Sequence, residues 1–334
     1  SNTGVLKNLL GLQRLYERLR NVKRERGALD IELGSQRLLF DEEKKVCGIV
    51  ETERLDSHRA IEECMILANV AAAKYLSTHK LEGLYRTHEQ PTEYKRTALS
   101  ALLQAFEFQN TLGGSNDPKE FSTVLREARK TKDCRGIEMA VLRSMQLASY
   151  SPFDSGHFGL ALESYAHFTS PIRRYPDLLV HRQIKASIGK KGIEKYPRLM
   201  EIAKSTSDCE RTAEAAEREV LLRNKIALVE TKIGEHFTGM ITGVTRFGVF
   251  VELMDCFVEG LVHISQLPVS SGQFDSSAQA FRNRKGKIVF CLGQKVKVRV
   301  EEVSVEENKI TLNLVRSRNV GGRHRSKRKE KRAR

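Results

Sequence analysis

The chain has 334 residues, and its 57 lysines and arginines against 42 aspartates and glutamates give a formal net charge of +15 at pH 7. A chain of this length is expected to fold as two or three domains, each with its own hydrophobic core. No apolar run approaches the 18 residues of a membrane span, which argues against a membrane role.

The basic charge is concentrated at one end of the chain. Residues 316–334 hold ten lysines or arginines against one acid, Glu330, so this end carries +9 and the other 315 residues carry +6. A basic tail on a mildly basic body indicates a polyanionic partner, most often nucleic acid. The alternative is a disordered tail that serves solubility alone.

The cysteines indicate the compartment. Six of them are scattered at positions 47, 64, 134, 209, 256 and 291, without a C-x-x-C pair or a Cys/His cluster of zinc-binding spacing. This pattern predicts reduced thiols in a cytosolic protein. No signal peptide opens the sequence, so a cytoplasmic location is expected.

The first quarter of the chain alternates between helical and extended patterns. Apolar residues spaced i, i+3 and i+4 predict a helix over residues 5–26, which Gly27 ends. Alternating apolar residues then predict a small hairpin or meander between residues 29 and 50. A second apolar stripe predicts a long helix over residues 57–77.

The middle of the chain is typical of helices separated by glycine-containing turns. Helices are predicted over residues 92–112, 118–131, 138–148, 171–186 and 197–229, the last as one helix or two. Before them, the segment L-Y-R-T-H-E-Q-P at residues 84–91 ends in a proline. Arg86 and His88 point to the same side if this segment is extended, and a plain surface loop is the alternative.

Residues 165–182 read Y-A-H-F-T-S-P-I-R-R-Y-P-D-L-L-V-H-R. Ser170 followed by Pro171 predicts a helix start, with a hydroxyl N-cap and proline at the first helical position. Such a start places Arg173 and Arg174 in the first turn, where free N–H groups and two guanidiniums form a cradle for phosphate. An Arg173–Asp177 ion pair at i,i+4 spacing explains the same residues, and physics alone leaves both interpretations open.

From residue 234 onward the pattern becomes all-β. The run F-T-G-M-I-T-G-V-T-R-F-G-V-F-V-E-L predicts two alternating strands, and G-L-V-H-I-S, residues 293–300 and residues 309–314 supply three more. Five short strands with glycine at the bends indicate an OB-type barrel. Aromatic side chains on one face of such a barrel are suited to stacking nucleic-acid bases, although some of these phenylalanines would also suit a core, and Phe237 is expected there.

Several segments resemble a known family. I-E-E-C-M-I-L-A-N at residues 61–69, L-Y-R-T-H-E-Q-P at 84–91 and H-F-T-S-P-I-R-R-Y-P-D-L-x-x-H-R at 167–182 resemble the ribonuclease II and ribonuclease R (RNB) family of exoribonucleases. F-G-V-F-V and G-L-V-H-I-S resemble the S1-type RNA-binding domain. The resemblance covers about residues 15–316, and its domain order is that of the bacterial ribonuclease R branch.

The resemblance implies an α+β fold made of three parts. Residues 1–230 would be the mostly helical C-terminal portion of an RNB catalytic domain, and residues 231–316 an all-β OB-fold barrel of the S1 type. Residues 317–334 would be a disordered tail rich in lysine and arginine. The implied activity is processive 3′→5′ degradation of RNA to 5′-nucleoside monophosphates.

The resemblance also implies a set of site residues. Arg173 and Glu210 are the expected catalytic residues, with Arg173 stabilising the charged phosphate and Glu210 contacting RNA near the scissile end. For Glu210 a solvated helix with i,i+4 ion pairs is the alternative. The further implied RNA-binding residues are Arg86, His88, Arg174, Tyr175, Phe247, Phe250, His263 and Lys309.

One departure from the family matters for function. The family uses Mg²⁺ held by four clustered aspartates, and such carboxylates are needed to hold hard cations and activate water. This sequence contains no D-x-x-D-x-D-D or similar run, and Asp117, Asp154 and Asp177 are isolated. The chain is therefore expected to be the C-terminal part of such an enzyme, a fragment or a split or decayed version, with no metal ligands of its own.

Two functions from different classes remain open at this stage. The chain is either part of a 3′→5′ exoribonuclease or a non-catalytic RNA- or ribosome-binding module. The expected partners are single-stranded and structured RNA, the ribosome, and the missing N-terminal part as a separate chain, with no membrane. A translation factor using its S1-type domain is a weaker third interpretation, because it leaves the segments resembling the catalytic domain unexplained.

Overall fold

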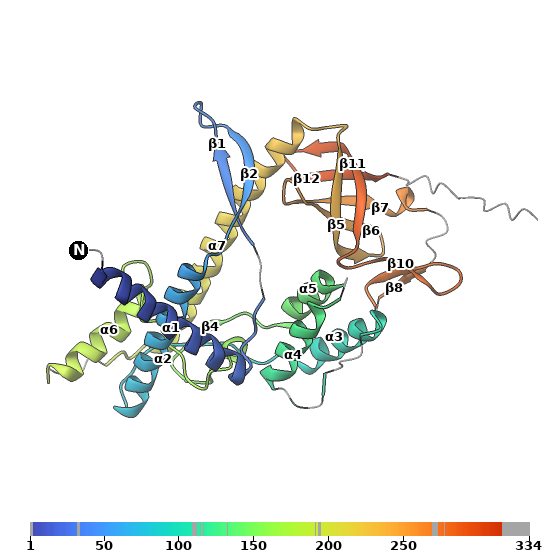
Figure 1. Cartoon of the computed structure of the whole chain (residues 1–334). Helices are drawn as coiled ribbons and strands as arrows, with labels where there is room; N and C mark the ends of the chain where they lie inside the picture. The colour runs from blue at the N-terminus through green and yellow to red at the C-terminus, as the bar shows by residue number, and fades with distance from the viewer. Residues whose placement is uncertain are drawn as a thin grey trace, which may run out of the picture.

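The computed structural model describes residues 3–31, 34–108, 112–113, 115, 117–131, 133–190, 192, 195–268, 273–276 and 278–315. A helical body and a β-barrel are joined by one long helix, α7 (Leu199–Glu230), so the expected α+β class is confirmed (Figure 1). The basic tail predicted over residues 317–334 lies outside the described residues. Within the described ranges, no helix has the length and apolarity needed to span a lipid bilayer.

Two helical layers form the body. The first contains α1 (Thr3–Arg26), α2 (Asp56–Thr78) and α6 (Tyr175–Ile188), and the second contains α3 (Glu93–Ala105), α4 (Pro118–Ala128) and α5 (Cys134–Ser144). Each layer has its own core. Leu76, Tyr85 and Val180 are buried in the first, and Phe121 and Ile137 in the second.

Several predicted helix boundaries need correction. The first two helices lie where the pattern placed them, but α3 ends at Ala105 and α5 begins at Cys134. The predicted start at Pro171 is wrong, because the N–H groups of Arg173 and Arg174 close a separate turn onto the Ser170 carbonyl at 3.3 and 3.1 Å. The backbone of Arg174 is then extended, so α6 begins at Tyr175, with Pro176 as its N-terminal proline.

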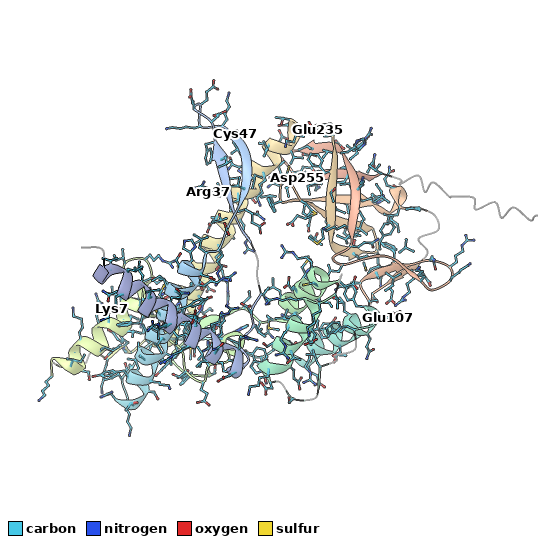
Figure 2. The ribbon with its side chains drawn as sticks, viewed as in Figure 1. Lys7, Arg37, Cys47, Glu107, Glu235 and Asp255 are labelled. Carbon is cyan, nitrogen blue, oxygen red and sulfur yellow. The ribbon has the colours of Figure 1, made fainter. Side chains whose placement is uncertain are left out.

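A β-hairpin extends from the body alongside α7. Its strands are β1 (Ser35–Phe40) and β2 (Val46–Thr52), and residues 29–31 before them are not a strand. Figure 2 shows Arg37 and Cys47 on this hairpin, well away from Lys7 on α1. Lys225 of α7 donates hydrogen bonds to the Gln36 side chain and, at 2.9 Å, to the Phe257 carbonyl, which ties the hairpin to the barrel side.

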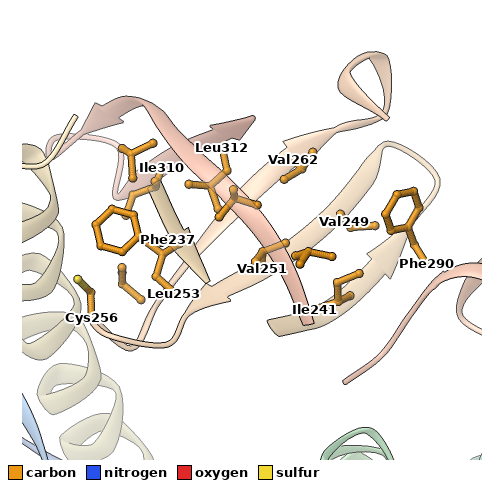
Figure 3. Packing of buried hydrophobic residues seen from close by; sticks show 14 of the residues in the cluster. Phe237, Ile241, Val249, Val251, Leu253, Cys256, Val262, Phe290, Ile310 and Leu312 are labelled. Carbon is orange, nitrogen blue, oxygen red and sulfur yellow. The ribbon is translucent and has the colours of Figure 1, made fainter. Parts of the chain in front are cut away.

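The predicted five-stranded barrel is confirmed. Its closed order is β11-β12-β7-β6-β5, and the strands are β5 (His236–Thr245), β6 (Gly248–Leu253), β7 (Val258–His263), β11 (Lys295–Ser304) and β12 (Lys309–Leu314). Alternate residues fill the interior, where Phe237, Val251 and Leu312 meet (Figure 3). Phe237 is 7% exposed, which confirms its predicted place in the core.

The sequence pattern missed a small sheet between β7 and β11. Its strands are β8 (Gln273–Asp275), β9 (Ala280–Arg282) and β10 (Ile288–Cys291), in the order β10-β9-β8. Strands of three or four residues are too short to show a period of two. This sheet leads the chain from the barrel back toward α5.

The barrel docks on the second helical layer through the residues that follow β10. Leu292 is 2% exposed and belongs to the hydrophobic cluster that contains Phe121 and Ile137. Gly136 of α5 lies so close that a Cβ there would be 2.6 Å from the Leu292 carbonyl oxygen. The side chain of Arg143 donates a hydrogen bond to the Thr242 carbonyl in β5. The two parts of the chain therefore share a tightly packed joint.

We expect Gly136→Ala to destabilise the chain by about 1–3 kcal/mol, since the added methyl group collides with backbone that cannot move independently. The matched control is Gly11→Ala, which is also helical but has no atom within 4 Å of the new Cβ. That change should stabilise by about 0.5–1 kcal/mol. Chemical denaturation measures the stability of both variants. Equal effects of the two substitutions would contradict the close packing of α5 against the residues that follow β10.

Candidate functional site

The turn that precedes α6 separates the roles of two neighbouring arginines. The fully buried carboxylate of Asp177 accepts the Ser170 N–H at 2.7 Å and Nη2 of Arg174 at 2.8 Å. The ion pair to Asp177 is therefore made by Arg174 and not by Arg173. Arg173 is exposed and has no ion-pair partner among the described residues. A guanidinium in this state is available to an anion.

A second arginine site lies on the short sheet of the helical body. Arg86 is in β3 (Tyr85–Thr87), which pairs with β4 (Ser149–Ser151). Its Nη1 lies 2.5 Å from Oε2 of Glu210 on α7, and its guanidinium carbon lies 4.7 Å from the centre of the Tyr150 ring. The structure thus brings together two predicted site residues that are 124 positions apart in the chain.

Tyr150 and His167 complete this cluster. The Tyr150 hydroxyl and Nδ1 of His167 are 2.8 Å apart, and the Tyr150 backbone N–H donates to the Ser207 hydroxyl at 3.0 Å. Burial raises the pKa of Tyr150 to about 12. Burial, with Arg174 and Arg86 nearby, lowers the pKa of His167 to about 2. Both groups are therefore neutral near pH 7. The sequence pattern assigned neither of them a role.

His88 uses both of its ring nitrogens within the protein. Nδ1 accepts the Gly159 N–H at 2.9 Å, and Nε2 lies 2.9 Å from the Gln146 carbonyl, to which it donates. Burial lowers the pKa of the ring, so it stays neutral. His88 thereby joins two chain segments, and the prediction that it contacts RNA has no free ring nitrogen to support it. Tyr175, by contrast, is 47% exposed at the start of α6.

The predicted RNA-binding residues of the barrel divide into an aromatic pair and two polar groups. Phe247 is 49% exposed, and its ring stands at 89° to that of Phe250 with the centroids 5.8 Å apart. His263 and Lys309 are exposed. Lys309 is paired at 2.7 Å with Glu307, and such a surface pair is weak enough to yield to a phosphate. The aromatic pair offers one open ring face for stacking.

The described residues do not fit a Mg²⁺ ion. No three His, Cys, Asp or Glu side chains converge as metal ligands in the part of the chain that the structure describes. Glu62 is paired with Arg54, and Glu63 is paired with Lys23 at 3.0 Å, so neither carboxylate is available. Octahedral coordination of Mg²⁺ needs carboxylate oxygens that converge on one point.

Two domain families match the chain. Residues 2–190 match the RNB domain, and residues 230–314 match the S1 RNA binding domain. The chain belongs to the RNB family. Curated relatives include ribonuclease R of Escherichia coli, 36% identical over 98% of this chain, and that of Buchnera aphidicola from Schizaphis graminum, 39% identical over 94%. The expected resemblance to ribonuclease R is thereby confirmed.

The match covers only part of these relatives. The chain spans 42% and 44% of their respective lengths, less than half of each. Among solved structures, RNase R of Mycoplasma genitalium in its apo form superposes with a TM-score of 0.83, covering 93% of this chain and 50% of that one at 24% identity. Yeast Ssd1, described as a pseudonuclease, gives a TM-score of 0.54 and 23% identity over 75% of this chain and 30% of that one. At these identities the structures establish the shared RNB fold.

Two partly buried histidines, His157 and His167, should make stability fall as the pH is lowered from 7 to 5. Burial, with His88 and Arg86 nearby, lowers the pKa of His157 to about 3, and that of His167 is about 2, whereas both are near 6.5 when unfolded. Below pH 6.5 the unfolded chain binds protons that the native chain excludes. The stabilisation that the two neutral imidazoles contribute is therefore complete above pH 6.5, and it declines as the pH falls toward their native pKa values.

The measurement is the thermal midpoint at pH 7, 6 and 5. Each imidazole contributes at most about 1.4 kcal/mol per pH unit to the dependence of the unfolding free energy on pH. His167→Phe should therefore reduce the change of the thermal midpoint with pH. A midpoint that stays constant from pH 7 to 5 would contradict the assignment of these two rings as neutral in the native chain.

Proposed function

We propose that this chain is the RNA-binding, arginine-bearing part of a 3′→5′ exoribonuclease that releases 5′-nucleoside monophosphates. The observation that carries the proposal is the turn before α6, where Asp177 neutralises Arg174 and leaves Arg173 unpaired in the described structure. An arginine held next to a fixed ion pair is suited to stabilise charge that develops on a phosphate. RNB family membership supports this use of the turn.

In the proposed mechanism the chain's own residues bind and orient RNA. Arg173 contacts the scissile phosphate, and Arg174 and Tyr175 line the path beside it. Arg86 fixes Glu210 through their 2.5 Å contact, so that Glu210 can position the terminal nucleotide. Mg²⁺ would supply the activated water in the whole enzyme, and its carboxylate ligands would have to come from outside this chain.

The barrel is proposed to hold RNA upstream of that site by stacking a base on Phe247, with Phe250, His263 and Lys309 beside it. RNase R of Mycoplasma genitalium has been solved with ribose-methylated single-stranded RNA and with double-stranded RNA, which supports both as partners. We propose residues 1–230, 231–316 and 317–334 as the catalytic part, the barrel domain and the basic tail. A cytoplasmic location, ribosome binding and a separate N-terminal chain remain predictions.

The second candidate is a non-catalytic RNA-binding module. It is favoured by the distribution of the ten aspartates, since no two of them are closer than 11 positions in the sequence. The run of clustered aspartates that the family resemblance implies is therefore absent from this sequence. The two candidates differ in one measurable property, which is whether activity appears when the rest of the catalytic domain is supplied.

For the barrel, Phe247→Ala should weaken binding of single-stranded RNA by about 1–3 kcal/mol without changing the thermal midpoint, because the ring is half exposed. Phe237→Ala is the matched control, since the same truncation in the core should cost about 3–5 kcal/mol of stability. Fluorescence anisotropy and thermal denaturation separate the two effects. If Phe247→Ala lowers stability and leaves RNA affinity intact, the stacking role is wrong.

For catalysis, the chain alone should release no nucleoside monophosphates with Mg²⁺ or Mn²⁺, and adding the N-terminal part that the family resemblance implies should restore release. In the restored enzyme Arg173→Ala should lower turnover far more than RNA affinity, because its contact strengthens as charge develops. Chelator-sensitive release of monophosphates by the chain alone would contradict the proposal. Full turnover by the Arg173→Ala enzyme would remove the role given to Arg173.

A further inference from the structure

We propose that His167 is an additional RNA-binding residue, which donates a hydrogen bond from Nε2 to a phosphodiester oxygen held beside Arg173. This inference rests on the proposed function, since it concerns the same phosphate site. The family motif contains His167, but neither the spacing of the motif nor the availability of Arg173 indicates what the imidazole does.

The position of the ring supports a contact with ligand. His167 lies in the extended segment between Tyr165 and the turn at Ser170. The rings of Tyr150 and Tyr165 meet it edge-on, with centroids 5.6 and 5.8 Å away, and fix its orientation. Nδ1 is bonded to the Tyr150 hydroxyl. Nε2 has no hydrogen-bond partner among the described residues, and the His167 side chain is only partly buried.

Tyr150 selects the tautomer in this proposal. Its hydroxyl holds its proton firmly, because burial raises the pKa to about 12, and Arg86 occupies the face of its ring. A phenol that donates to Nδ1 leaves the imidazole proton on Nε2. The free nitrogen is then an N–H donor, which is the group that an anionic oxygen requires.

The charges around the ring favour one kind of anion. Arg86 from β3 and Arg173 and Arg174 from the turn face His167, together with neutral His157. Glu210 balances Arg86 and Asp177 balances Arg174, so three cations and two carboxylates leave one positive charge. One positive charge matches the single negative charge of an internal phosphodiester better than the two charges of a terminal phosphate.

The same neighbours explain why a neutral donor suits this place. An imidazolium would add a cation to a half-buried cluster that already holds three guanidiniums, and both burial and those charges oppose protonation. A neutral N–H avoids this repulsion and keeps its donor between pH 5.5 and 7.5. The hydrogen bond to RNA should then be independent of pH across that range.

The test measures binding of a fluorescent single-stranded RNA with a 3′-hydroxyl to the full chain at pH 5.5 and 7.5. A hydrogen bond to a charged oxygen corresponds to roughly tenfold or more in affinity, so His167→Phe should weaken binding by that factor equally at both pH values. His167→Gln, which keeps an N–H donor, should retain most of the affinity. His79→Phe is the control, because that ring also contacts a tyrosine ring but lies at the end of α2.

Two further measurements identify the contact. An RNA whose 3′-terminal linkage is an uncharged methylphosphonate should bind more weakly than normal RNA and lose its sensitivity to His167→Phe. An RNA with a 3′-terminal phosphate monoester should bind no better than the 3′-hydroxyl RNA. Nitrogen-15 NMR should show a neutral His167 ring protonated at Nε2 at both pH values.

Several outcomes would overturn the inference. They are unchanged affinity of a folded His167→Phe variant, an equal loss with His167→Gln, tighter binding of the 3′-phosphate RNA, and titration of His167 near pH 6.5. If Phe247→Ala weakens RNA binding while His167→Phe does not, only the role of His167 fails. If the chain binds no RNA at all, the proposed function fails as well.

Discussion

The buried carboxylate of Asp177 is the interaction on which the geometry of the candidate site depends. A carboxylate without solvent exposure needs charged or hydrogen-bonding partners, and it finds them at Ser170 and Arg174. Those two residues bracket the turn, so its conformation follows from satisfying one buried charge. The hydrogen bonding of this ion pair is incomplete, since Oδ2 of Asp177 and Nε of Arg174 are buried without hydrogen bonds among the described atoms.

Helix α7 relates this site to the rest of the chain. Ser207 and Glu210 near its start hold Tyr150 and Arg86, while Ile226 and Val229 near its end belong to the barrel core. At about 1.5 Å per residue, roughly 24 Å of helix separates Glu210 from Ile226. Residues 211–218 between them are all exposed, so this stretch holds its shape through local helical bonds and charged side chains.

The sequence predicted the parts of the fold that depend on local pattern. The alternation around Phe237 and Val251 identified barrel strands, and the apolar stripe of α2 identified a helix, because burial of one face imposes a period. The start of α6 was predicted wrongly because Ser170-Pro171 and Tyr175-Pro176 both offer a proline for the first turn. The choice between them is made by Asp177, whose burial depends on tertiary packing.

For the candidate site, the sequence identified the individual residues better than it identified their contacts. Arg173, Arg86 and Glu210 were found through resemblance, but the bond between Arg86 and Glu210 joins segments that only the fold brings together. Tyr150 lies in none of the recognised motifs, and it contacts His167 from strand β4, which is a contact that only the fold creates.

Leu292 belongs to the barrel region by sequence and to the core of helices α3, α4 and α5 by packing. A cut at the sequence boundary near residue 230 would therefore remove a side chain from the interior of the other part and expose it to water. The domain boundary that the sequence indicates is consequently not a boundary between two independently stable units. Its two halves are expected to melt in one cooperative transition, as a single foldon.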